Sequence, residues 1–222
     1  MSSPFDWSYF WSIAFLFLKG LEMTLFLAVI CNALAVILAY VFAAAVHFRI
    51  RVVREMILFY VSVIRNTPLL VQIFFFYFGM PEIGVRTDPT TSGIIVLTLW
   101  ASAYQTANLR GGIDNVPRAL TEAMRALGLR PIDAFVFIVV PVATRAVVPA
   151  MMNTMVSTIK NSALLSAIGV PELTFVAMDN IAETYRAIEN FVALLIGYLA
   201  IVLGFSAMMT SLERYLGRGY RR

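Results

Sequence analysis

Three residue types are scarce in this chain of 222 residues, and each scarcity removes a class of function. The one cysteine, Cys31, excludes an intrachain disulfide, and the one histidine, His47, excludes a three-histidine zinc site. The lysines are Lys19 and Lys160, and neither lies in a G-x-x-x-x-G-K-[ST] phosphate-binding loop. The chain is therefore not expected to bind ATP in that way, and it offers no Cys/His cluster with the spacing of metal ligands.

Charge is scarce as well. Charged residues make up 14% of the sequence and hydrophobic residues 60%, with a mean hydropathy of +0.82. A soluble domain is nearer 45–50% apolar and about 25% charged. The net charge is +4, but the basic residues are scattered between apolar blocks, a pattern typical of orientation in a bilayer rather than of nucleic-acid binding. The composition predicts an all-α, polytopic membrane protein.

A helix that spans a membrane needs about 20 mostly apolar residues. The sequence has five such windows: residues 21–46, 56–78, 93–109, 142–168 and 191–212. Residues 1–20 are expected to form a short interfacial segment, in which Trp7, Tyr9 and Trp11 suit the headgroup region. Asp6, rather than Lys or Arg, precedes the first apolar run, so no signal peptide is predicted. No internal repeat is visible, and residues 1–222 are expected to form one membrane domain.

The basic residues predict the orientation in the membrane. They are concentrated in the loops 47–54 and 110–145 and in the C-terminal tail, whereas the loops 80–91 and 171–190 hold one arginine each. Loops rich in Lys and Arg remain in the cytoplasm. We therefore expect the N-terminus outside the cell and the C-terminus in the cytoplasm.

The cytoplasmic loop 110–141 contains a short amphipathic segment. Its apolar residues recur at helical spacing and predict one buried stripe: Leu120, Ala123, Met124 and Leu127. Its other face is polar, with Arg118, Thr121, Glu122 and Arg125. Pro117 suits a helix start, Gly128 suits the residue after a helix end, and a second short helix can begin at Pro131. On this pattern alone, the segment either rests on lipid headgroups or docks on a partner.

The spacing of this loop carries a family resemblance. Glu122-Ala123-Met124 is followed after three residues by Gly128, and after nine more by Ile138-Val139-Val140-Pro141. This resembles the EAA loop of ABC importer permeases, with Met124 in place of the second Ala and Val140 in place of a Leu. Further segments resemble the polar amino acid branch, and most closely its histidine/glutamine/glutamate permease subfamily: RNTPLLVQ at 65–72, RGGI at 110–113, VP at 116–117, KNS at 160–162 and IGVPEL at 168–173.

The resemblance implies a type I ABC importer permease fold with five transmembrane helices in the bacterial inner membrane. It implies that the EAA loop is a coupling helix that sits in a cleft of a separate ATPase subunit, which binds ATP and magnesium. The residues carried over to this coupling role are Glu122, Ala123, Met124, Arg125, Gly128 and Pro141. A second permease, in a homodimer or heterodimer, and a periplasmic or extracellular substrate-binding protein are the further partners. The chain itself is then neither an enzyme nor the holder of a cofactor.

Polar residues inside the predicted spans mark a candidate substrate path, because ionisable groups are costly at bilayer depth. Arg65 lies within the second window, and Pro68, which removes a backbone donor, destabilises the helix there. The candidates are Arg65, Asn66, Thr67, Tyr104, Gln105, Asn108, Lys160, Asn161 and Ser162. Arg65 could alternatively snorkel, or pair with backbone carbonyls as a structural pin.

Two departures from the resembling family bear on the substrate. Relatives commonly carry Glu at the position of Ala107 and Asp at that of Asn161, so this chain lacks both acidic groups. Arg65 and Lys160 remain as the charges of the predicted path. An acidic or neutral polar amino acid is therefore the expected substrate, unless a partner permease supplies the missing carboxylates, and a strong preference for arginine or lysine would contradict this.

Two other functions compete with an ABC importer permease. An autonomous secondary carrier or channel for small polar solutes would usually show inverted repeats and more spans. An intramembrane enzyme would need a Ser/His or Asp pair within the spans, and the predicted spans have none. A carrier would transport alone, whereas a permease would be inert without its ATPase.

Overall fold

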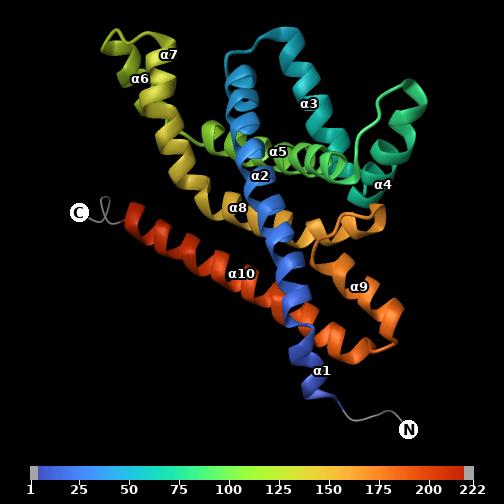
Figure 1. Ribbon diagram of the computed structural model, residues 1–222. Helices are drawn as coiled ribbons and strands as arrows, with labels where there is room; N and C mark the ends of the chain where they lie inside the picture. Colours follow the sequence, from blue (N-terminus) through green and yellow to red (C-terminus); the bar gives the residue numbers. More distant parts are fainter. Residues whose placement is uncertain (1–4, 218–222) are drawn as a thin grey trace. The chain divides into compact units, whose positions relative to one another are not determined.

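The computed structural model describes residues 5–217, with side chains as far as residue 211, and every regular element in that range is helical (Figure 1). The longer helices are α2 (Ala14–His47), α3 (Arg51–Asn66), α5 (Pro89–Asp114), α8 (Val140–Asn161), α9 (Leu173–Thr184) and α10 (Ala187–Gly217). The short helices are α1 (Trp7–Ser12), α4 (Leu69–Phe74), α6 (Arg118–Ala126) and α7 (Pro131–Ala134). Turns of π-helix cover Phe75–Gly79 and Phe135–Val139, and turns of 3-10 helix cover Met80–Ile83 and Ser162–Ile168.

Contacts divide the chain into two compact units. Unit 1 comprises Met1–Asn32, Pro68–Thr98 and Met155–Arg222, and unit 2 comprises Ala33–Thr67 and Leu99–Thr154. The all-α prediction is confirmed, and the observed helices overlap all five predicted windows. α2 begins at Ala14 rather than at residue 21, so only α1 and its flanks remain of the predicted interfacial segment.

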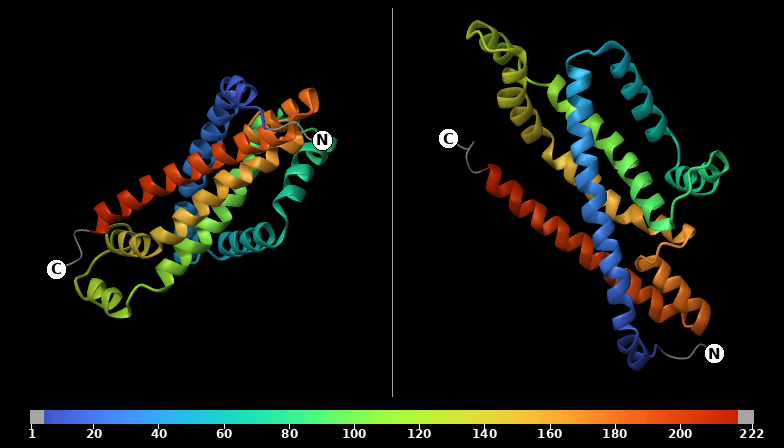
Figure 2. Two further views of the ribbon diagram at one scale, coloured as in Figure 1. Left: turned by 90° about the horizontal axis from the view of Figure 1, so that it is seen from below. Right: turned by 45° about the horizontal axis from the view of Figure 1, so that its top comes forward.

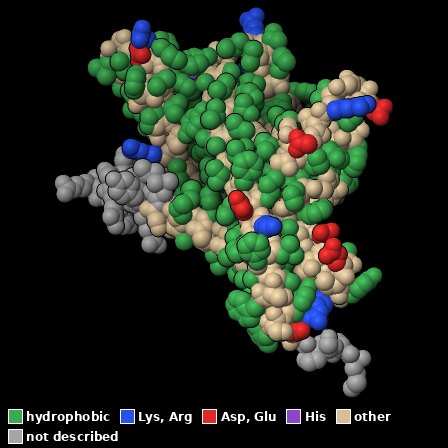
Figure 3. Space-filling model, viewed as in Figure 1, with side chains coloured by type: hydrophobic (Ala, Val, Ile, Leu, Met, Phe, Trp, Pro, Cys, Tyr) green, Lys and Arg blue, Asp and Glu red, His purple; other side chains and the backbone are tan. Residues whose placement is uncertain are grey.

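The number of membrane spans stays a prediction. Three stretches of the described chain are long and apolar enough to cross a bilayer: Ala14–His47, Pro131–Ile168 and Ala187–Ser211. The pair Arg51–Asn66 and Leu69–Ile83 qualifies only if the two segments are counted together as one broken span. α5 corresponds to the remaining predicted window, but it buries polar side chains such as Ser102, Gln105 and Thr106, which lower its hydropathy. Along α2, hydrophobic side chains cover much of the face in Figure 3, as expected for contact with lipid.

Unit 2 is held together by small and branched apolar residues. One buried cluster joins Ala39 and Ala43 of α2 to Leu109 of α5 and Met151 of α8. A second cluster joins the end of α2 to α3 and α5 through Val46, Ile57, Val61 and Ala103. Alanine on α2 lets neighbouring backbones approach closely, which is how helices associate where lipid removes the hydrophobic driving force.

Unit 1 is organised around the hairpin of α9 and α10, which lie side by side in both views of Figure 2. Leu173 and Ala177 of α9 pack against Ile13 and Phe17 near the start of α2. Glu172 caps α9: its fully buried carboxylate accepts hydrogen bonds from the Phe175 N–H (2.8 Å) and the Tyr198 hydroxyl (2.7 Å). This cap satisfies donors at the helix start and ties α9 to α10.

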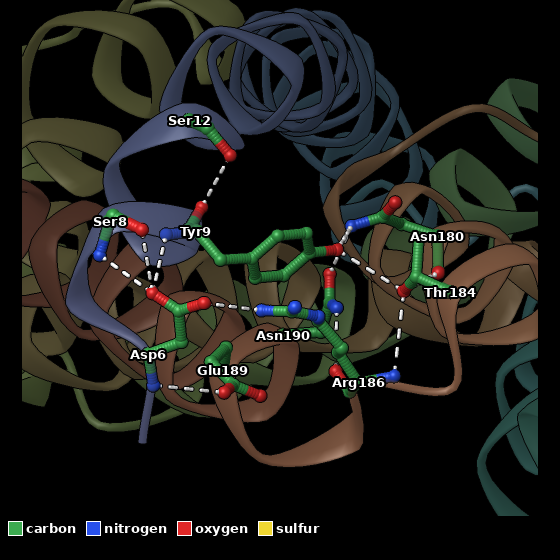
Figure 4. Close-up of polar contacts among 9 residues, drawn as sticks. All are labelled: Asp6, Ser8, Tyr9, Ser12, Asn180, Thr184, Arg186, Glu189 and Asn190. Atoms are coloured by element: carbon green, nitrogen blue, oxygen red, sulfur yellow. Dashed lines mark hydrogen bonds and ion pairs between the residues drawn. The ribbon is translucent and has the colours of Figure 1, made fainter. Parts of the chain in front are cut away.

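Helix α1 is fastened to the α9–α10 hairpin by a polar network (Figure 4). Asp6 caps α1 by accepting the N–H groups of residues 8 and 9, and its other oxygen accepts a hydrogen bond from Arg186 at 2.7 Å. The Tyr9 hydroxyl donates to Thr184 (3.1 Å) and accepts from Asn180 (2.8 Å), while the Arg186 guanidinium lies 4.3 Å from the centroid of the Tyr9 ring. We refer to this network as the α1 strap.

The α1 strap should respond to acid through Asp6. Arg186 holds the pKa of Asp6 well below its ordinary value, so the stabilisation is present above the unfolded pKa of about 4 and is lost as the pH falls below it. An Asp6→Asn variant should melt at a lower temperature than wild type at about pH 6, and the difference should shrink towards about pH 3. Thermal melting in detergent measures this, with Asp179→Asn, an exposed carboxylate of α9, as the control. A difference that is the same at both pH values would show that the ion pair contributes nothing.

Candidate functional site

An open cleft of about 480 Å³ lies between α3 and α5 within unit 2. The α3 residues that line it recur at helical spacing and so share one face of that helix: Leu58, Val61, Ser62 and Arg65. Asn66 at the end of α3 and Tyr104 and Arg110 of α5 complete the lining. The lining therefore combines apolar and polar side chains with two arginines, and no carboxylate is among these described residues.

Arg65 stands at the end of α3, where the helix breaks. Its guanidinium carbon lies 5.1 Å from the centroid of the Tyr104 ring, within the range of a cation–π contact. The side chains of Asn66 and Thr67 donate to the carbonyls of Ser62 (2.7 Å) and Val63 (2.8 Å), one turn back along α3. The predicted effect of Pro68 is confirmed: α3 ends at Asn66, and the next helix, α4, begins at Leu69.

Arg110 is the charged cleft residue that the sequence did not predict as part of the path; Leu58, Val61 and Ser62 were not predicted either. Its side chain is 43% exposed, and its Nε lies 3.7 Å from the Asp114 carboxylate one helical turn away. That distance is longer than a hydrogen bond. The spacing of Leu58, Ser62 and Arg65 in the sequence indicates that they share one face of α3. The sequence of neither helix, however, shows that this face lies beside α5.

Gln105 and Asn108 lie in the packing of α5 against α8 and do not line the cleft. The fully buried Gln105 amide donates to the carbonyl of Met151 (3.1 Å), and the Asn108 amide donates to the Thr154 hydroxyl (3.0 Å). These bonds tie two helices together inside unit 2. Of the nine predicted path residues, the structure brings only Arg65, Asn66 and Tyr104 to the cleft.

The predicted path residues Lys160, Asn161 and Ser162 belong to unit 1. α8 ends at Asn161, and the chain continues as 3-10 helix from Ser162, so the regular helix does end at this motif. Ser162 is buried, and its hydroxyl donates to the carbonyl of Ile159 at 2.8 Å. Lys160 is exposed and Asn161 is half-buried.

The two-helix element predicted in the loop 110–141 is present. α6 runs over Arg118–Ala126 with Pro117 at its N-cap, and α7 begins at Pro131. Met124, which is 4% exposed, packs against Phe135 and Val139 and so fixes α6 to the segment that follows α7. We call residues 117–134 the coupling element, after the role that the sequence predicts for them.

A glycine-dependent turn makes the corner of the coupling element. Gly128 has φ +68°, its N–H donates to the Arg125 carbonyl (3.0 Å), and the N–H of Leu129 donates to that of Met124 (3.2 Å). This pair of bonds is a Schellman motif, which satisfies the last carbonyls of α6 and needs a left-handed residue at position 128. Arg130 then forms two hydrogen bonds with Asp133 (2.6 and 3.1 Å), which stiffen the entry to α7 and raise the pKa of Arg130.

The predicted buried stripe of α6 is wrong at two positions. Ala123 and Leu127 are exposed, Leu127 by 77%, because Phe135 and Val139 cover only the turn around Met124. Glu122 and Arg125 are exposed as predicted, and so are Leu129 and Ile132. Pro141 is exposed just after the π-helical turn Phe135–Val139, where the regular helical bonding changes. The coupling element thus presents mixed apolar and charged side chains on a frame held by the turn at Gly128 and by the packing of Met124.

Comparison with known proteins identifies the family. Residues 33–222 match the family described as "Binding-protein-dependent transport system inner membrane component". The chain belongs to this family. The permease is 32% identical over 212 residues to the glutamine transport system permease protein GlnP of Escherichia coli strain K12, with 95% of this chain and 97% of that protein covered. It is also 32% identical over 221 residues to the octopine transport system permease protein OccM of Rhizobium radiobacter, with 95% and 89% covered.

Solved structures agree with this assignment. The permease superposes on a chain from an amino acid ABC transporter crystallised with histidines, with a TM-score of 0.88 at 30% identity, over 96% of this chain and all of the other. A chain of the MetNI methionine ABC transporter, at 18% identity, shares the fold with a TM-score of 0.76. The permease therefore has the type I ABC importer fold and is a membrane subunit of an ABC importer in the inner membrane. An ATPase subunit and a substrate-binding protein are the partners that this family implies.

Proposed function

We propose that this permease carries a polar amino acid, acidic or neutral, across the inner membrane, driven by an ATPase subunit that docks on the coupling element. The observation that carries the coupling role is the rigid, exposed α6–α7 corner. A Schellman turn at Gly128 and the buried Met124 hold its shape, while Glu122 and Leu127 face solvent. A corner of fixed geometry can transmit a displacement, whereas a mobile loop would absorb it.

Relatives of nearly full length support an amino acid or amino acid derivative as the substrate. The named relatives are transport permeases for glutamine and octopine, and the superposed amino acid transporter was crystallised with histidines. The cleft of unit 2 adds two guanidinium groups without an acidic neighbour in its lining, which disfavours a cationic side chain.

The remaining arrangement follows from the same proposal. Two permeases, identical or different, form the path, and the chain itself holds neither ATP nor a cofactor. The N-terminus and the loops 80–91 and 171–190 face the substrate-binding protein, and the C-terminus and the coupling element face the cytoplasm. The one membrane domain, residues 1–222, would rock against its partner during alternating access.

Reconstitution tests the proposal directly. The permease is placed in proteoliposomes with its ATPase and binding protein, and uptake of radiolabelled glutamine, glutamate and arginine is measured with and without ATP. We expect ATP-dependent uptake of glutamine or glutamate, and no uptake when the ATPase is omitted. Uptake by the permease alone would contradict the coupling role, and a strong preference for arginine would contradict the substrate class.

A further inference from the structure

The geometry points to a specific role for the cleft of unit 2: we propose that Arg65 and Arg110 together bind a carboxylate group of the transported solute. This inference rests on the proposed function, and it adds Arg110 as a ligand-binding residue and names the group that the cleft selects. Two arginines from different helices line the cleft. Guanidinium groups match the planar geometry of a carboxylate better than any other side chain.

The charge balance of the cleft favours an anion. Two arginines line the cleft, and its lining residues, all within the described part of the chain, include no carboxylate to offset them. Asp114 is the acid paired with Arg110, but at 3.7 Å, with its side chain 69% exposed, it is a weak and solvent-screened partner. A bound anion would reduce the electrostatic repulsion between two positive charges that line the same cleft, so anion binding is favoured there.

The geometry of Arg65 leaves its charge available to a ligand. Its guanidinium is placed against the face of the Tyr104 ring, a contact that fixes its position without neutralising it. Stacking also limits the rotamers of a long side chain, so less conformational entropy is lost when a ligand binds. The side chains of Asn66 and Thr67 also donate hydrogen bonds to backbone carbonyls in the last turn of α3, next to Arg65.

The size and remaining lining of the cleft suit a small amphiphilic molecule. About 480 Å³ falls within the range of small-molecule sites. The polar groups Ser62 and Asn66 lie beside the apolar side chains of Leu58 and Val61. A carboxylate at the arginines would leave the rest of an amino acid against this mixed surface. The carboxylate can be that of the amino acid backbone or that of an acidic side chain.

A binding experiment without the substrate-binding protein isolates this selectivity. The complete permease–ATPase complex is placed in lipid nanodiscs, and four probes compete with radiolabelled glutamine: glutamate, glutamine, isoglutamine and glutamic acid diamide. Isoglutamine keeps only the side-chain carboxylate, glutamine keeps only the backbone carboxylate, and the diamide keeps neither. We expect the diamide to bind at least about tenfold more weakly than the best of the others, the loss expected when charge-assisted hydrogen bonds are removed. Glutamine against isoglutamine shows which carboxylate is bound.

Variants decide whether the arginines cause the preference. Arg65→Gln and Arg110→Gln should reduce the ratio of carboxylate to diamide affinity towards one, whereas Arg65→Lys and Arg110→Lys should retain part of it. Arg51→Gln, at the exposed start of the same helix α3, is the matched control and should keep the wild-type ratio. A purely structural role would lower the affinity for all four probes equally. The inference is therefore overturned if Arg65→Gln and Arg110→Gln both keep the wild-type ratio of carboxylate to diamide affinity.

The two proposals fail in different ways. If the wild-type complex with its binding protein takes up no amino acid, the proposed function is wrong. If it takes up amino acids but the wild-type nanodisc complex binds the diamide as tightly as glutamine and glutamate, only the carboxylate site is wrong. Gel filtration of each variant excludes misfolding as the cause of a lost signal.

Discussion

A Gly128→Val permease should insert into the membrane normally but lose ATP-driven transport by at least about tenfold, the effect of roughly 1.4 kcal/mol or more at one coupling step. Gly128 has φ +68°, and a left-handed conformation costs an L-residue about 1–2 kcal/mol, more when the side chain is β-branched. No atom lies within 4 Å of an added Cβ, so the effect comes from the backbone and not from a clash. The chain can relieve the strain only by opening the turn that joins α6 to α7, which would change the surface offered to the ATPase.

Two further variants test whether a loss of transport comes from the α6–α7 surface or from a general effect on membrane insertion. Gly204→Ala adds a methyl group at an exposed glycine of α10 that also has open space around it, and it should transport as wild type does. Glu122→Lys keeps the turn but reverses an exposed charge of α6, so it should reduce co-purification of the ATPase or separate hydrolysis from transport. Membrane insertion, ATPase co-purification, hydrolysis and uptake are measured for each variant. If Gly128→Val and Glu122→Lys both assemble and transport normally, the coupling assignment is wrong.

The sequence predicted the coupling element well because its boundaries depend on local chemistry. Pro117 can start a helix, Gly128 can adopt a left-handed conformation and Pro131 can open the next helix, and each property belongs to a single residue. Burial on α6 was predicted less well. Periodicity shows which face of a helix is apolar, but it does not show how much of that face a neighbouring segment covers. The short apolar segment around Phe135 covers Met124 and leaves Leu127 in solvent.

The candidate site was only partly predictable for a related reason. Sequence alone identified Arg65 because an arginine before a proline within an apolar window is anomalous wherever the helix packs. Arg110 lies at the end of a window, where arginine is ordinary, and only the pairing of α3 with α5 makes it part of a cleft. Gln105 shows the opposite case: it is polar within a window, but its amide bonds to a backbone carbonyl of α8. Hydropathy does not distinguish a polar residue used for packing from one that faces a solute.

A Gly112→Leu permease should lose folded protein outright, the largest stability effect that we expect from a single substitution in unit 2. At Gly112 an added Cβ would lie 2.9 Å from the carbonyl oxygen of Ala143 and 2.8 Å from a methyl group of Val147. The valine can rotate, but the backbone oxygen of α8 cannot move without shifting that helix. Overpacking of this kind typically costs about 1–3 kcal/mol, and the remaining atoms of a leucine add to the cost.

The neighbouring glycine provides a control one residue away. Gly111 lies in the same helix, is exposed, and has no atom within 4 Å of an added Cβ, so Gly111→Ala should keep the wild-type melting temperature or raise it slightly. Gly112→Ala should melt below Gly111→Ala, and Gly112→Leu should give little monodisperse protein in detergent. The three variants share a helix and a membrane environment, so differences in helix propensity or lipid contact cannot explain this order. Equal stability of Gly111→Ala and Gly112→Ala would mean that α5 and α8 do not approach as closely as the distance to the Ala143 carbonyl requires.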